Sequence, residues 1–287
     1  MIASIGDLVL DIRIVPEGPL RPNDDTESII TVGGGGQAAN FCAWTAWLGE
    51  PVRLVTRIGD DSTGSQLVAD LRAAGVEVGA VAGPEPTGAV AVLIGPDGDR
   101  TMATQRGASV GLRPEDLRPE WFADVDLIHV PAYSLFREPL SLAAREAIER
   151  VRARGGRLSI DLSSVAGLQE YGAEQFAVEL DRLQPDLLFA TALEAAALAA
   201  ELRGLAVHAI VKLGAAGCQV GSRRITAPSV EALDPTGAGD AFAAAFCAAF
   251  VHGASPIEAA ERAVEVAALA VTQPGARPGG GRRAPVR

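Results

Sequence analysis

The strongest candidate for chemistry is a carboxylate that follows a run of small residues where a helix is expected to begin. The run reads Asp234-Pro-Thr-Gly-Ala-Gly-Asp240, and an apolar stretch follows at once. Small residues let backbone N–H groups at a helix N-terminus approach an anion closely, and the aligned peptide dipoles favour negative charge there. Gly237, Ala238 and Gly239 therefore predict an anion hole, beside which Asp240 could accept a proton from an attacking hydroxyl. The alternative is a tight turn with a carboxylate that only complements the helix dipole.

A second glycine run, Gly33-Gly-Gly-Gly-Gln-Ala-Ala-Asn40, also precedes an expected helix. Glycines permit a ligand to approach the backbone, and Asn40 offers both a donor and an acceptor to hydroxyl groups. The spacing Gly34-x-Gly36-x-x-Ala39 matches a loose dinucleotide fingerprint, but no acidic residue follows about 20 positions on at a strand end. A nicotinamide or flavin oxidoreductase is therefore the weaker reading.

Lys212 is the only lysine among 25 basic residues, and Leu213-Gly214 follows it. A Walker P-loop requires Ser or Thr after its lysine, so that motif is excluded. The residues around Lys212, up to Gly217, predict a strand that ends in a glycine-rich turn. Such a turn can border a bound nucleotide, and it is equally common with no ligand. Asp11 lies on or just after the first expected strand, near the sheet edge where open α/β proteins bind ligands, although a surface carboxylate is also consistent.

Glu194 and Arg106 have two interpretations each. The spacing Thr191-x-x-Glu194 is typical of a helix capping box, and a metal role for Glu194 is the alternative. Arg106 could pair with a substrate carboxylate or be a solvated loop residue.

Apolar runs and amphipathic or alanine-rich stretches alternate along the chain, which is typical of an α/β protein with a mostly parallel sheet. The expected strands are residues 2–5, 52–58, 127–130, 157–160, 187–189 and 207–213. The expected helices are residues 37–48, 63–74, 140–154, 191–202, 237–252 and 257–271.

Two segments, 13–32 and 89–105, break this alternation and predict antiparallel strands that project from the sheet as a small lid. The second predicts a hairpin that turns at residues 96–99. We expect residues 278–287 to form a flexible tail, because that segment has too little apolar content to fold. The chain would then be a single domain over residues 1–287 with both lid segments inserted.

Composition excludes several classes of protein. The net charge is −11, which disfavours binding to the nucleic-acid backbone. The longest uncharged apolar run, residues 241–251, is far shorter than the roughly 20 residues that a membrane helix requires. The N-terminus lacks the features of a secretion signal, so we expect a cytoplasmic protein. The three cysteines have no metal-binding spacing.

Taken together, the two glycine motifs resemble those of the ribokinase-like (phosphofructokinase B type) carbohydrate and nucleoside kinases. The N-terminal signature is similar to Gly35-Gly-Gln-Ala-Ala-Asn40 continuing to Arg57-Ile-Gly-Asp-Asp61, and the C-terminal one to residues 234–240. The resemblance covers about residues 2–275 and implies a three-layer α/β/α sandwich with a mostly parallel central sheet and a small β lid.

The resemblance implies ATP-dependent phosphorylation of a hydroxymethyl group on a sugar or sugar derivative, with Mg²⁺ and possible activation by K⁺ near Asp234 and the Gly275-Ala-Arg277 segment. Asp240 would be the general base beside the anion hole. Substrate hydroxyls would be held by Asp11, Gly35, Gly36 and Asn40, and Arg106 would contact the substrate. The nucleotide would be bordered by Thr191, Lys212, Gly214, Gly217 and Thr236, with Glu194 steering the metal. Exposed lid strands would form a homodimer.

Within this family the substrate stays open. A 2-keto-3-deoxygluconate-type sugar-acid kinase is one alternative, favoured by Arg106. A nucleoside kinase is another, for which Tyr133 and Phe136 are the candidate stacking residues, with Trp44 and Trp47 expected in the core. Gln37 replaces a lysine and Val9 an asparagine that ribokinases carry, which disfavours ribose. A ligand-binding protein that has this fold but no catalytic activity is the alternative from a different functional class.

Overall fold

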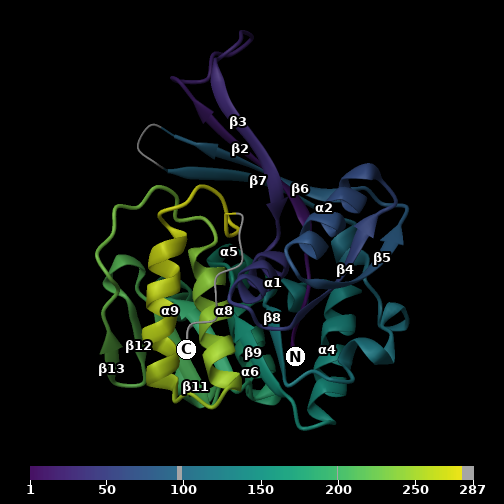
Figure 1. The fold of residues 1–287 in the computed structure, drawn as a ribbon, viewed down its shortest axis with the longest axis vertical. Helices are drawn as coiled ribbons and strands as arrows, with labels where there is room; N and C mark the ends of the chain where they lie inside the picture. The colour runs from purple at the N-terminus through teal and green to yellow at the C-terminus, as the bar shows by residue number, and fades with distance from the viewer. Residues whose placement is uncertain (96–98, 199, 280–287) are drawn as a thin grey trace.

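Strands spread along the whole chain build one large sheet. The structure is a computed structural model that describes residues 1–95, 99–198 and 200–279 (Figure 1). Within them, nine strands lie in the order β13-β12-β11-β10-β9-β8-β1-β4-β5. The pairs from β5 to β11 are parallel, and β12 and β13 are antiparallel additions at one edge. Their bounds are β1 (Ile2–Ile5), β4 (Val52–Gly59), β5 (Glu77–Gly83), β8 (Leu127–Pro131), β9 (Arg157–Asp161), β10 (Leu187–Thr191), β11 (His208–Lys212), β12 (Cys218–Val220) and β13 (Arg223–Ile225).

Helices cover both faces of this sheet, as the resemblance implied. Alternate strand residues point to opposite faces, so two apolar clusters form, one on each side. One face packs against α1 (Gln37–Trp47), α2 (Ser62–Ala73), α8 (Ala238–Val251) and α9 (Pro256–Ala270). The other packs against α3 (Tyr133–Phe136), α4 (Leu140–Arg152), α5 (Val165–Tyr171), α6 (Ala173–Leu183) and α7 (Ala192–Ala197). The three-layer α/β/α architecture is therefore confirmed.

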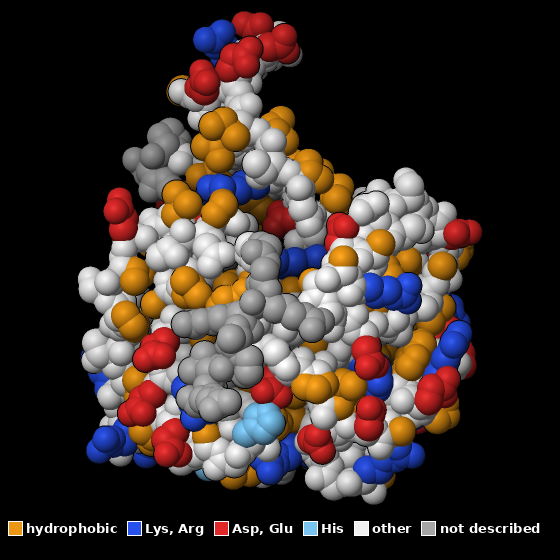
Figure 2. All heavy atoms as spheres, viewed as in Figure 1, with side chains coloured by type: hydrophobic (Ala, Val, Ile, Leu, Met, Phe, Trp, Pro, Cys, Tyr) orange, Lys and Arg blue, Asp and Glu red, His pale blue; other side chains and the backbone are white. Residues whose placement is uncertain are grey.

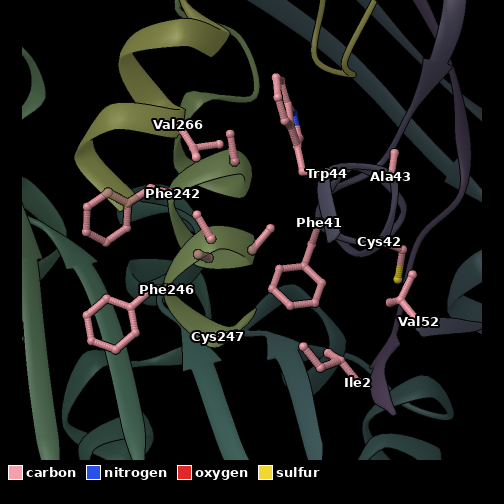
Figure 3. Packing of buried hydrophobic residues seen from close by; sticks show 14 of the residues in the cluster. Ile2, Phe41, Cys42, Ala43, Trp44, Val52, Phe242, Phe246, Cys247 and Val266 are labelled. Atoms are coloured by element: carbon pink, nitrogen blue, oxygen red, sulfur yellow. The ribbon is translucent and has the colours of Figure 1, made fainter. Parts of the chain in front are cut away.

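The helices that follow the two glycine motifs, α1 and α8, pack against each other. Phe242 and Phe246 lie on one side of α8, and Phe41 lies between α1 and α8 above Ile2 (Figure 3). Trp44 is buried in the same cluster, as expected. Burying such side chains contributes about 1.5–3 kcal/mol each, so the two helices are fixed relative to each other.

A second, four-stranded sheet projects from the body (Figure 1). Its order is β3-β2-β6-β7, with bounds β2 (Val9–Pro16), β3 (Ser28–Gly35), β6 (Thr87–Ile94) and β7 (Arg100–Gly107). Both segments expected to form a lid lie in it, with longer strands than the sequence indicated. The expectation of purely antiparallel strands is wrong, because β2 and β6 pair in parallel. The chain returns to the body between the two hairpins, so the second enters the small sheet from the same end as the first.

Some element bounds differ from the sequence-based ones. The helix expected over residues 191–202 ends at Ala197 and is followed by a separate 3-10 turn, Leu202–Gly204. An alanine-rich run has no apolar periodicity to set its length, whereas the buried Leu198 and Leu202 draw the chain back to the sheet. The sequence did not indicate β2, β5, β12, β13, α3, α5 or α6.

Two expectations reach beyond the described residues. The hairpin turn at 96–99 and the tail at 278–287 fall largely outside them. Among the helices that are described, none combines the length and the apolar character needed to cross a membrane.

Candidate active site

The two glycine motifs meet where α1 and α8 begin. Gly36 precedes α1 with φ 99° and Gly237 precedes α8 with φ 77°, conformations that favour glycine. Because both helices begin at the same end of the packed pair, Asn40 and Asp240 approach each other. The Asn40 Nδ2 donates to Asp240 Oδ2 at 3.1 Å. Two residues 200 positions apart in the sequence therefore share one hydrogen bond.

Asp240 has the properties of a general base. Burial raises its pKa from the ordinary aspartate value to about 8, and this effect outweighs the Asn40 hydrogen bond, which lowers the pKa. Asp161 and Asp7 also raise it, while Lys212 lowers it. A carboxylate with a pKa near working pH is suited to take a proton from a hydroxyl group.

Lys212, at the end of β11, supplies positive charge next to the predicted anion hole. Its Nζ donates to Asp161 Oδ2 at 2.5 Å and lies 3.4 Å from where a Cβ on Gly239 would be. Burial acts to lower the lysine pKa, but Asp161 and Glu194 raise it above its ordinary value overall. The ammonium group therefore stays charged. Asp161 was not identified from the sequence, because nothing local marks this strand-end carboxylate as functional.

Glu194 and Thr191 form the capping box that the sequence indicated. Thr191 Oγ1 accepts from the Glu194 N–H at 3.2 Å, and Glu194 Oε2 accepts from the Thr191 N–H at 2.7 Å. Burial and Asp161 raise the pKa of Glu194. The buried carboxylates of Asp161, Glu194 and Asp240 surround a single lysine, so this region fits a further cation. Among the described residues, no group of three or more His, Cys, Asp or Glu side chains is placed to hold a metal ion. Mg²⁺ is usually bound by one or two carboxylates together with phosphate groups and water.

Two buried carboxylate oxygens near the glycine motifs are without hydrogen-bond partners. Asp7 Oδ1, after β1, and Asp11 Oδ1 have no hydrogen-bond partner. Asp11 lies on the lid strand β2 opposite Gly33, rather than at the edge of the main sheet as expected, and its side chain packs beside Gly35. Burial raises the Asp11 pKa. Buried acceptors without partners are rare in folded proteins, and the hydroxyl groups of a ligand would satisfy these two.

Arg106, at the end of the lid strand β7, faces an aromatic wall. Its guanidinium pairs with Asp7 at 3.3 Å and stacks 3.9 Å from the Tyr133 ring centroid. A pocket of about 420 Å³ extends from here along Phe136 and Tyr171. Tyr171 completes this wall but was not expected from the sequence.

A second pocket of about 300 Å³ lies beneath the lid, lined in part by Asp11, Arg13, Asp234, Thr236 and Arg277. In the space-filling view the molecule is hollowed between lid and body, where charged side chains gather (Figure 2). Asp234 is buried, and its Oδ2 lies 3.6 Å from Arg13 Nε. The sequence did not point to Arg13, and it pointed to Arg277 only as part of the Gly275-Ala-Arg277 segment of a cation site that the family resemblance implied.

Thr236 reaches the lid directly. Its hydroxyl donates to Asp234 Oδ1 at 2.6 Å and accepts from Arg100 Nη1 on β7 at 3.0 Å. Gly214 and Gly217 instead form the turn after β11, with φ 59° and 92°. A side chain on Gly217 would collide with the Ile225 backbone. Packing alone therefore requires glycine at this position, whether or not a nucleotide binds nearby.

The chain matches the model of the pfkB family carbohydrate kinases over residues 1–279. A 2-dehydro-3-deoxygluconokinase from Thermoproteus tenax is 29% identical over 94% of this chain and 88% of its own length. An ATP-dependent ribose-1-phosphate kinase from Halopiger xanaduensis is 31% identical over 85% of this chain and 82% of its own length.

Solved structures agree with this assignment. An adenosine kinase from Sinorhizobium meliloti superposes with a TM-score of 0.84 at 27% identity, covering 96% of this chain and 95% of that one. A ribokinase II candidate from E. coli in complex with ATP and Mg²⁺ gives a TM-score of 0.83 at 26% identity, covering 96% and 94%.

Proposed function

The chain belongs to the pfkB family of carbohydrate kinases, and from this premise we propose that Asp240 is the general base that activates a hydroxymethyl group of a sugar or sugar derivative for phosphorylation by ATP. ATP-dependent sugar phosphorylation is the activity of the chain. The roles of individual residues are our assignment.

The observation that carries this assignment is the surroundings of Asp240, which include the Lys212 ammonium and the Asp7 carboxylate. Lys212 lies against Gly239. Asp7 Oδ1 and Asp11 Oδ1 are buried without hydrogen-bond partners. A polyhydroxylated acceptor would donate to these carboxylates, and to Asn40 and the backbone at Gly35 and Gly36, while its reacting hydroxyl faces Asp240.

The chemistry then needs positioning, charge neutralisation and one base. Asp240 accepts the hydroxyl proton as that oxygen attacks the γ-phosphorus of ATP and the bond to ADP breaks. The backbone N–H groups of Gly237, Ala238 and Gly239 and the Lys212 ammonium stabilise the charge on the transferred group. Thr191, Thr236, Gly214 and Gly217 border the nucleotide. Mg²⁺ supplies screening of the phosphate charges, and Glu194 would hold it through water.

A neutral or acidic sugar is our first candidate acceptor. Two relatives are named for a sugar acid and a sugar phosphate. Arg106 could contact an acidic group on the acceptor if it exchanges its partner Asp7. A nucleoside is the second candidate, favoured by the aromatic wall of Tyr133, Phe136 and Tyr171 along the larger pocket.

A monovalent cation such as K⁺ beside Asp234 is less well supported. Both carboxylate oxygens of Asp234 already accept hydrogen bonds, from Thr236 and from the Gly275 N–H. The Arg13 guanidinium, 3.6 Å away, supplies the positive charge. These residues do not fit an added cation at the carboxylate, so no step depends on one. A homodimer through the lid and a cytoplasmic location stay predictions.

The test is an assay of ADP release with Mg-ATP against sugars, sugar acids, sugar phosphates and nucleosides, for the wild type and Asp240→Asn. We expect turnover on one class of acceptor and a loss of about 10²–10⁴-fold in kcat in the variant, with ATP binding kept. Equal rates for both proteins would disprove the role of Asp240. ATP and acceptor binding without any turnover in the wild type would indicate a binding protein.

A further inference from the structure

A short C-terminal strap, Gly275–Arg277, joins the two glycine motifs. The Gly275 N–H donates to Asp234 Oδ2 at 3.0 Å, next to the anion-hole segment. The Ala276 carbonyl accepts from the buried Trp44 Nε1 on α1 at 3.0 Å. These contacts hold the strap against both helix N-termini and direct the next side chain, Arg277, into the site.

The Arg277 guanidinium is seated on the glycine run. Its Nη2 donates to the Gly35 carbonyl at 2.9 Å, and its Nε donates to Asn40 Oδ1 at 3.1 Å. A Cβ on Gly34 would collide with Nη1, whereas a Cβ on Gly33 would have no atom within 4 Å. Gly34 therefore leaves the room that the guanidinium occupies.

This contact fixes the orientation of the Asn40 amide. A guanidinium only donates hydrogen bonds, so the amide oxygen must face Arg277. The amide nitrogen must then face the Asp240 carboxylate, to which it donates at 3.1 Å. If the amide flipped, it would present oxygen to a carboxylate and nitrogen to a donor, and both hydrogen bonds would be lost.

We propose that Arg277 is a positioning residue of the phosphoryl transfer, which acts through Asn40 to orient the Asp240 carboxylate. The inference rests on the proposed role of Asp240 as general base. The groups that face Asp240 are Asn40 from α1, Asp7 after β1, Asp161 from β9 and Lys212 from β11. Of these, only the Asn40 amide has two orientations, and Arg277 selects one.

The effect on the base has a definite sign. The Asn40 hydrogen bond lowers the Asp240 pKa against the burial that raises it. The positive charge of Arg277 and the carboxylate of Asp240 also attract each other. Removal of the guanidinium therefore favours the protonated carboxyl on both counts and moves the onset of activity to higher pH.

The experiment compares Arg277→Met, Arg277→Lys, Gly34→Ala and Gly33→Ala by pH profiles of kcat and kcat/KM. We expect Arg277→Met to lower kcat about 10- to 100-fold near neutral pH, as for loss of a charged hydrogen bond, and to move the acidic limb upward. Arg277→Lys should recover part of both effects. Gly34→Ala displaces the guanidinium from the opposite side and should reproduce them. Gly33→Ala, whose added methyl group would have no atom within 4 Å, leaves the Arg277 contacts in place and should not move the acidic limb.

Thermal unfolding of each variant shows whether a lower kcat comes from a loss of folded protein, as for a structural role, or from a change in the site of a folded protein, as for a positioning role. If Arg277→Met does not fold, Gly34→Ala against Gly33→Ala still decides the question. Wild-type kcat and pH profiles in Arg277→Met and in Gly34→Ala, with Asp240→Asn inactive, would overturn this inference alone. An active Asp240→Asn would instead overturn the proposed function on which it rests.

Discussion

At the scale of single residues, the charge of Lys212 bears on both the stability of the fold and the proposed phosphoryl transfer. Its side chain is 13% exposed and that of Asp161 is 1% exposed, so two nearly buried charges balance each other. The same ammonium lies against Gly239, the last residue of the proposed anion hole. Loss of either charge would leave the other without compensation in a poorly solvated place, which is costly.

Lys212→Met is therefore expected to lower kcat about 10²–10³-fold, as for the loss of one group that stabilises transition-state charge. It should also destabilise the fold by about 3–5 kcal/mol, because Asp161 is left buried and unpaired. The double variant Lys212→Met/Asp161→Asn should recover most of the stability and none of the rate. Urea unfolding and ADP release measure the two quantities. Recovery of both together would show that Lys212 has only a structural role.

The pKa of Asp240 predicts the pH dependence of the wild-type enzyme. With a value raised to about 8, the carboxyl is mostly protonated below that pH and becomes an effective base above it. We expect kcat/KM to rise with pH and level off above about 8. A limb near pH 4, where an exposed aspartate titrates, would contradict this assignment.

At the scale of elements, one carboxylate ties the body to the lid. Asp61 caps α2 by accepting from the Gly64 N–H at 2.7 Å, and it also accepts from the N–H and hydroxyl of Thr87, each at 2.8 Å. Thr87 begins β6, so the joint between β4, α2 and the second sheet depends on this side chain. The hydrogen bonds from Thr87 and Gly64 lower the Asp61 pKa.

Asp61→Ala should lower the free energy of unfolding by about 1–2 kcal/mol, the usual range for loss of a helix N-cap. Asp60→Ala, its exposed neighbour, is the matched control. Because the folded pKa of Asp61 is lowered, its contribution is present above the unfolded pKa and is lost as pH falls through the folded pKa. Urea unfolding at neutral and acidic pH should show the difference between the variants shrink on acidification. Equal stabilities at neutral pH would contradict this account.

At the scale of the whole molecule, the lid presents an apolar face. Ile30 and Val32 are 59% and 63% exposed, and they pair with Ile14 and Ile12 of β2. Residues two apart share one face of a strand, so these four point the same way. Hydrophobic side chains gather along the middle of the lid, with acidic ones at its tip (Figure 2). Such a face on a monomer favours association with a second copy.

We therefore expect the wild type to sediment as a dimer at micromolar concentrations and Ile30→Asp to sediment as a monomer. A charge at Ile30 would lie in the apolar contact between the two lids and would lose its hydration there. Val207→Asp, which alters an exposed apolar residue on the body, is the control and should remain a dimer. A wild type at monomer mass would exclude the lid dimer.

The sequence by itself determined the features that depend on local backbone requirements. Six of the nine main-sheet strands and the two helices that follow the glycine motifs could be predicted from apolar patterning, and their approximate positions were confirmed. Glycine before a helix and a carboxylate in its first turn are likewise local signals, which is why Asp240 and Asn40 could be singled out. The resemblance to the family, and the sandwich it implies, rested on the same two motifs and was confirmed.

Only the tertiary structure decided which side chains from other segments complete the site. Asp161 meets Lys212 across 51 residues, and Arg277 meets Asn40 across 237. In a segment rich in proline and glycine, the sequence does not distinguish a solvated arginine from a buried one, because the segment has no periodic apolar pattern. The Arg277 guanidinium fits its position because Gly34 has no side chain there. That space forms only when the helices and the lid have packed, so the sequence alone does not show it.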